Sequence, residues 1–120
     1  MSDLKDRIQD VIENEPVALF IKGTPEKAMC GNSQRAIDAL RSAGAPFTAV
    51  DVLPHPHIRQ ELSALSGWPT IPQVFIKGEL VGGADIAEEL AASGDLERKL
   101  TEKLGEDYRG AAVQKVVPVL

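Results

Sequence analysis

Residues 68–83 of this 120-residue chain, WPTIPQVFIKGELVGG, carry its clearest structural pattern. QVFI and ELVG have the length and apolar content of two short β-strands, and Lys77–Gly78 between them is typical of a tight turn. A loop with two prolines leads into the first strand, and Gly82–Gly83 leaves the second at a point where backbones can approach closely. This block therefore predicts two strands joined by a tight turn.

The segments before this block alternate between helical and extended patterns. Apolar residues at helical spacing predict a first helix that ends before Pro16, and the wholly apolar run VALFI, residues 17–21, predicts a central buried strand. A second helix carries a stripe of small apolar residues and can close at Gly44 in a left-handed cap. The run FTAVDV, residues 47–52, predicts another strand.

The C-terminal half adds further helices. Apolar positions predict one helix through Ile58 and Leu65, and two closing helices through Leu90 and Leu104. The predicted order is αβαβαββαα. Residues 106–120 lack either period and are expected to form a tail that can dock through its valines.

Charge and length exclude several classes of protein. The chain has 13 basic and 18 acidic residues, a formal net charge of −5, which is the wrong sign for binding the phosphate backbone of nucleic acid. No apolar run reaches the length of a membrane span, and the N-terminal segment is charged without an apolar region behind it. We expect one soluble, cytoplasmic domain with no nucleic-acid or membrane partner.

Cys30 is the single cysteine, so the fold is not held by disulfides. Ser33 stands three residues later, where a dithiol motif has its second sulfur. If GNSQRAIDAL opens a helix, Cys30 precedes its first turn, where free N–H groups and a positive charge on Lys22 favour the thiolate. The alternatives are that Cys30 is a small buried apolar residue and that Ser33 caps the helix; polar flanks argue against burial of Cys30.

These motifs resemble those of the monothiol glutaredoxins, a branch of the thioredoxin-like fold, over residues 4–105. The matching pieces are KGTPE, CGNS in place of Cys-Gly-Phe-Ser, DVL, an arginine in the following helix, the block 68–83 and the dipeptide AD. The resemblance implies an α/β fold with a central four-stranded mixed sheet flanked by helices, a cis-proline loop, a glutaredoxin domain in residues 1–105 and a tail in 106–120. Asn32 and Ala84 depart from the family, which has an aromatic residue and often Cys or Ser at these positions.

The resemblance also implies a glutathione site. Lys22 and Arg59 would pair with the glycine-end carboxylate, the backbone of Ile71 would pair with the tripeptide, and the start of the helix at Asp85 would hold the γ-glutamyl end. The complete implied set is Lys22, Cys30, Arg59, Thr70, Ile71, Pro72, Gly83, Ala84 and Asp85. Without the resemblance, the two basic residues would be ordinary surface residues, Pro72 would be trans, and Asp85 would be a helix cap.

Two functions remain open. In the first, Cys30 from each of two chains and the thiols of two glutathiones ligate a [2Fe-2S] cluster, so that the protein is a dimer with the cluster and a monomer without it, and serves iron–sulfur assembly with BolA-like and client proteins. In the second, Cys30 is the catalytic nucleophile of a glutathione-dependent thiol-disulfide oxidoreductase that removes glutathione from proteins without a cluster. An adaptor that does not use Cys30 is a third possibility. Asn32 would change the shielding of the sulfur in any of them.

Two further features have ordinary interpretations. His55 and His57 in PHPH do not share a helix face, and no second group of ligands completes a metal site, so we expect a loop or helix start. Trp68 is expected to be a packing residue of the loop.

Overall fold

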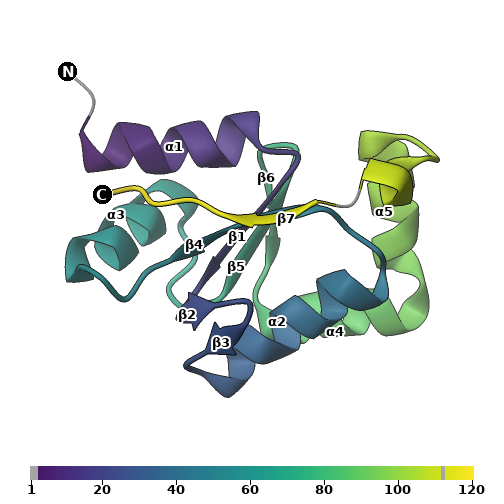
Figure 1. The fold of residues 1–120 in the computed structure, drawn as a ribbon, viewed down its shortest axis with the longest axis horizontal. Coiled ribbons are helices and arrows are strands. Elements are labelled where there is room, and N and C mark those ends of the chain that lie inside the picture. Colours follow the sequence, from purple (N-terminus) through teal and green to yellow (C-terminus); the bar gives the residue numbers. More distant parts are fainter. Residues whose placement is uncertain (1–2, 112) are drawn as a thin grey trace.

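The computed structural model describes residues 3–111 and 113–120, and a five-stranded mixed sheet lies between two layers of helices (Figure 1). The strand order is β6-β5-β1-β4-β7. The strands are β1 (Val17–Ile21), β4 (Phe47–Asp51), β5 (Gln73–Ile76), β6 (Glu79–Gly82) and β7 (Gln114–Val116). β1 is parallel to β4 and antiparallel to β5, and β7 is parallel to β4. The carboxyl ends of β1 and β4 therefore lie at one edge of the sheet.

Helices cover both faces of the sheet, as Figure 1 shows. The helices are α1 (Leu4–Asn14), α2 (Gly31–Ser42), α3 (Pro56–Ser66), α4 (Ala84–Ser93) and α5 (Asp95–Leu104). Phe20 of β1 packs with α1 and α3, whereas Leu19 packs with α2 and α5. All five residues of β1 are buried because apolar helices cover both sides, which confirms the predicted central strand. No helix in residues 3–111 or 113–120 is long and apolar enough to cross a membrane.

The predicted hairpin of block 68–83 is confirmed. β5 and β6 pair in antiparallel register, and both turn residues have positive φ, 51° at Lys77 and 82° at Gly78. Such φ values belong to the two-residue turns that match strand twist, and glycine adopts them without strain. Next to the turn Ile76 pairs with Glu79 and Phe75 with Leu80, and the register shifts between Phe75 and Val74.

The sheet has five strands where the sequence predicted four. The additional strand, β7, has three exposed residues, so its sequence has no alternation that could reveal it. Short strands β2 (Gly23–Thr24) and β3 (Lys27–Ala28) and a 3₁₀ turn at Tyr108–Ala111 are also additional to the predicted order.

Residues that follow position 105 pack against the rest of the molecule. The Tyr108 hydroxyl donates to the carbonyl of Ala43 at 2.7 Å, and Val119 is buried in the cluster beneath α1 and α3. Docking through a valine is as predicted. The division into a domain of residues 1–105 and a tail of 106–120 stays a prediction.

Candidate functional site

Cys30 is the N-cap residue of α2, half-buried and in extended conformation. Hydrogen bonds from the backbone N–H groups of Ser33 and then Asn32 lower the pKa of its thiol, partial burial acts in the opposite direction, and the positive charge of Lys22 lowers the pKa further. Unpaired N–H groups at a helix start are the physical origin of the main effect. The helix start and the lysine thus act in the direction that the sequence predicted.

Ser33, in the position of the missing second sulfur, is fully buried. Its Oγ accepts the backbone N–H of Lys22 at 3.1 Å, and its hydroxyl also lowers the pKa of the Cys30 thiol. The Ser33 hydroxyl therefore joins the end of β1 to the first turn of α2. The sequence had suggested instead that this hydroxyl caps the helix. This bond fixes the lysine backbone beside the cysteine.

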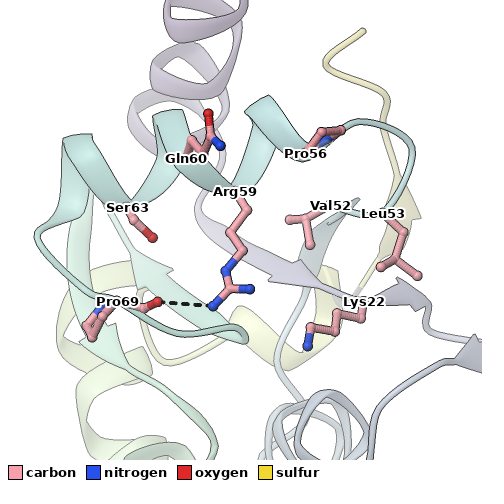
Figure 2. A pocket seen from close by; sticks show the side chains of 8 residues that line it. All are labelled: Lys22, Val52, Leu53, Pro56, Arg59, Gln60, Ser63 and Pro69. Atoms are coloured by element: carbon pink, nitrogen blue, oxygen red, sulfur yellow. Dashed lines mark hydrogen bonds between the residues drawn. The ribbon is translucent and has the colours of Figure 1, made fainter.

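A cavity of about 630 Å³, which we call the cationic pocket, lies beside the end of β1 and the start of α3. Figure 2 shows the side chains of Lys22 and Arg59 pointing into it from opposite sides, with Arg59 Nη2 donating to the carbonyl of Pro69 at 3.5 Å. It is lined by Lys22, Val52, Leu53, Pro56, Arg59, Gln60, Ser63 and Pro69. Because these described lining residues include two cations and no acidic side chain, the pocket suits a carboxylate.

The loop wall of the cationic pocket is held by Asp51 at the end of β4. Asp51 Oδ1 accepts the backbone N–H groups of Gly23 and Leu53, each at 2.9 Å. Gly23 has φ 94°, and a Cβ there would lie 2.4 Å from the carbonyl oxygen of Lys27, so only glycine fits. One carboxylate therefore joins the segment after Lys22 to the segment before α3.

A second cavity of about 220 Å³, the α4 pocket, lies at the start of α4. It is lined by Asn32, Arg35, Trp68, Thr70, Ile71, Pro72, Gly83, Ala84, Asp85 and Ile86. The Ile71–Pro72 peptide bond is cis. Six of the residues that the resemblance assigned to glutathione thus line the α4 pocket. The two basic residues of that set, Lys22 and Arg59, line the cationic pocket.

Arg35 connects α2 to α4 at the α4 pocket. Its guanidinium donates to Asp85 Oδ1 at 2.7 Å, to both oxygens of Glu88 at 2.9 and 3.0 Å, and to Asn32 Oδ1 at 3.1 Å. Hydrogen bonding to Arg35 lowers the pKa of Glu88. Of these charged residues, Arg35 and Asp85 line the α4 pocket, which therefore presents one charge of each sign, whereas the cationic pocket presents two cations.

Gln73 organises the loop between the pockets and was missed by sequence reasoning. It is fully buried, and its Nε2 donates to the carbonyls of Trp68 and Thr70 at 2.9 and 3.2 Å, while Ser66 Oγ donates to its Oε1 at 2.7 Å. A glutamine at the start of an otherwise apolar strand was the available signal, because a buried amide needs partners. Arg35 and Glu88 were missed as well, since they lie 53 residues apart.

Trp68 packs against Gly83 beside the α4 pocket, in keeping with its expected packing role. A Cβ at position 83 would lie 3.3 Å from Trp68 Nε1 and 3.3 Å from the carbonyl oxygen of Pro72. The buried indole Nε1 has no acceptor in residues 3–111 and 113–120. A side chain at position 83 would therefore be crowded by Pro72 and Trp68, although its φ value is not one that requires glycine.

The chemistry of the donors limits what the chain can bind alone. The described residues contain no group of three or more His, Cys, Asp or Glu side chains that could hold a metal ion. His55 is the N-cap of α3, and its Nδ1 accepts the backbone N–H of His57 at 3.2 Å, which is the expected helix-start role. Cys30 fits as one thiolate ligand of an iron–sulfur cluster, whose other ligands would have to come from outside the chain.

Comparisons with known proteins agree on one family. The glutaredoxin family model matches residues 17–81. A probable monothiol glutaredoxin 2 of Rickettsia felis is 47% identical over 93 residues, covering 78% of this chain and 89% of the relative. Monothiol glutaredoxin-S11 of Oryza sativa is 46% identical over 99 residues, 82% of this chain, but this chain spans only 20% of that protein's length.

Solved structures give the same result. A monomeric truncated mutant of Trypanosoma brucei 1-C-Grx1 has a TM-score of 0.75 and 48% identity, covering 86% of this chain and 93% of that chain. A buckwheat glutaredoxin–glutathione complex has a TM-score of 0.73 and 25% identity, covering 92% of each chain. The predicted thioredoxin-like α/β fold is confirmed by these neighbours and by the sheet.

Proposed function

Because this chain belongs to the glutaredoxin family, as a monothiol member, we propose that it binds glutathione and, as a dimer, a [2Fe-2S] cluster for iron–sulfur assembly or transfer. The observation that carries the proposal is one cysteine whose pKa is lowered both by Asn32 of the α4 pocket and by Lys22 of the cationic pocket. A ligand that matches has a carboxylate at one end, a zwitterionic amino-acid group at the other, and a thiol between them. Glutathione has this arrangement.

Each end of glutathione has a set of partners. Lys22 and Arg59 bind the glycine carboxylate in the cationic pocket, where charge-assisted hydrogen bonds are strong. The N–H groups at the start of α4 bind the γ-glutamyl carboxylate, and Asp85 accepts from the ammonium. The buckwheat neighbour, by its title, forms a complex with glutathione, which supports this assignment.

The cluster requires a second chain. Four thiolates ligate a [2Fe-2S] cluster, and each chain provides one, Cys30, with one more from its bound glutathione. When bound, the cluster supplies iron and sulfide for transfer. The chain's own contribution is to favour the thiolate form of Cys30 through the N–H groups of Ser33 and Asn32, which lower the pKa of its thiol. A monomer without the cluster, BolA-like and client partners and a cytoplasmic location complete the proposal.

The lowered pKa of Cys30 also favours a second function, a glutathione-dependent oxidoreductase. The Cys30 thiolate attacks the glutathione sulfur of a protein mixed disulfide, a new Cys30–glutathione disulfide forms, and the client sulfur leaves as a thiolate that takes a proton from water. The thiolate of a second glutathione then attacks this disulfide, which gives oxidised glutathione and restores the Cys30 thiolate. Ser33 cannot resolve the disulfide because it has no thiol.

Anaerobic reconstitution with iron, sulfide and glutathione tests the proposal. We expect a coloured dimer with about one cluster per two chains, measured by visible absorption and size-exclusion chromatography. Cys30→Ser should remove both the colour and the dimer, while the matched variant Ser42→Ala, far along α2, should keep both. If the wild-type protein stays colourless and monomeric but reduces a glutathione mixed disulfide in a Cys30-dependent reaction, the cluster proposal is wrong and the oxidoreductase replaces it.

A further inference from the structure

We propose that Arg35 is a specificity-determining residue that recognises the α-carboxylate at the γ-glutamyl end of the bound thiol peptide. This inference rests on the proposed glutathione site. Arg35 lines the α4 pocket together with Asp85, but neither the sequence motifs nor the resemblance assigned it a role.

The guanidinium of Arg35 has a donor left for a ligand. An arginine has five N–H groups, and the described residues accept from four of them: Nε donates to Glu88, Nη1 donates once to Asn32, and Nη2 donates to Asp85 and Glu88. The remaining N–H is on Nη1. The four bonds hold the planar group in one orientation, so little conformational entropy is lost when a ligand carboxylate binds the fifth.

Asp85 remains available although it pairs with Arg35. Its side chain is 88% exposed, and Arg35 contacts only Oδ1, which leaves Oδ2 for an ammonium group. Arg35 and Asp85 thus present a positive and a negative group side by side. An α-amino acid end, with its carboxylate and ammonium on one carbon, matches this pair.

The charge balance shows why the arginine is needed. Without Arg35, Asp85 in the α4 pocket and Glu88 one turn further along α4 would both be uncompensated carboxylates. They would attract the ligand ammonium but repel the ligand carboxylate, which the N–H groups at the start of α4 must then hold alone. Arg35 therefore favours ligands that carry the α-carboxylate over those that lack it.

The test measures calorimetric affinity of the full chain for three ligands: glutathione, an analogue without the γ-glutamyl α-carboxylate (4-aminobutanoyl-Cys-Gly), and one without the α-amino group (glutaryl-Cys-Gly). Arg35→Ala should weaken glutathione and the deaminated analogue about tenfold, because one charge-assisted hydrogen bond is lost. It should change affinity for the decarboxylated analogue by less than about twofold, since that ligand lacks the group in question. Arg35→Lys should recover part of the loss.

The control is Arg41→Ala, on the same helix, where an exposed arginine donates to Gln114 and lines neither pocket. It should leave all three affinities unchanged. Equal weakening of all three ligands by Arg35→Ala would show that the arginine only ties α2 to α4, and no weakening would show no contact; either result overturns the inference. If the wild-type chain does not bind glutathione at all, both the proposed function and the role of Arg35 are wrong. If the wild-type chain binds glutathione and Arg35→Ala binds it equally well, only the role of Arg35 is wrong.

Discussion

Replacing Gln73 by methionine should destabilise the protein by about 3 kcal/mol. Three hydrogen bonds of 3.2 Å or less end on its buried amide, from Ser66 Oγ and to the carbonyls of Trp68 and Thr70. Each contributes about 1 kcal/mol net, so the loss of all three costs about 3 kcal/mol. Methionine has a similar volume and flexibility, so a cavity adds little. The loss is therefore almost wholly a hydrogen-bonding effect.

Equilibrium unfolding in urea, followed by circular dichroism, measures this loss. The midpoint should fall while the m-value stays constant, because the surface exposed on unfolding does not change. Gln9→Met is the control: the Gln9 side chain is exposed, with one hydrogen bond to Glu13, and its replacement should change the stability by less than about 0.5 kcal/mol. Glutathione affinity should fall with Gln73→Met, since Thr70 and Ile71 lie on the loop that Gln73 holds.

Gln73→Glu tests whether the site disfavours a negative charge. Its carboxylate would face two carbonyl oxygens in a buried site, so the variant should be less stable than Gln73→Met at pH 7. Such a surrounding raises the pKa of the carboxyl in the folded state above its unfolded value. The penalty is therefore greatest when the carboxyl must be charged, and the stability relative to wild type should recover as the pH falls. A loss below about 1 kcal/mol in Gln73→Met, or no difference between the two variants, would refute the role given to Gln73.

Three further predictions concern the site and its backbone. The alkylation rate of Cys30 against pH should have its midpoint below the value near 8.5 of a free thiol, because the N–H groups of Ser33 and Asn32 favour the thiolate; a normal midpoint would contradict this role. Because the folded-state pKa is lowered, the thiolate stabilises the folded protein at pH values above the unfolded-state pKa. This stabilisation is lost as the pH falls through the folded-state pKa. Arg59→Ala should weaken glutathione binding about tenfold and reduce its salt dependence, whereas Arg98→Ala, an exposed residue paired with Asp95, should change neither; equal effects in calorimetry would count against the cationic pocket. Gly83→Ala should lower the free energy of unfolding by about 1–3 kcal/mol, because the new Cβ would lie 3.3 Å from atoms of Pro72 and Trp68. Gly31→Ala is the control and should not destabilise the protein, because a Cβ there meets nothing within 4 Å. The opposite order of stabilities in urea unfolding would be inconsistent with this packing.

Periodicity was sufficient to predict the elements that bury a continuous apolar stripe. Ile8 and Ile12 marked α1, and the run Val17–Ile21 marked the central strand, because burial itself imposes these patterns. β7 was not predictable in this way. Its residues are exposed, and it is held by backbone hydrogen bonds to the edge of β4, which any sequence can make.

In the candidate site as well, the sequence revealed residues with a local role and missed residues whose partners lie far away along the chain. Cys30 could be recognised because its role depends on a local feature, the helix start that follows it. Ser33 and Gln73 serve partners across the fold, and Arg35 binds carboxylates 50 and 53 residues away. A pair of acidic residues at Asp85 and Glu88, three apart on one helix, was the only local trace of that contact.

In the proposed dimer, each chain contributes one Cys30 thiolate and one glutathione to a shared cluster. The most direct test is the composition of the reconstituted protein after anaerobic gel filtration, with iron, sulfide, glutathione and polypeptide measured on the same fraction. We expect a dimer with about one iron, one sulfide and one glutathione per chain. A coloured fraction that lacks glutathione, or one that is monomeric, would contradict it.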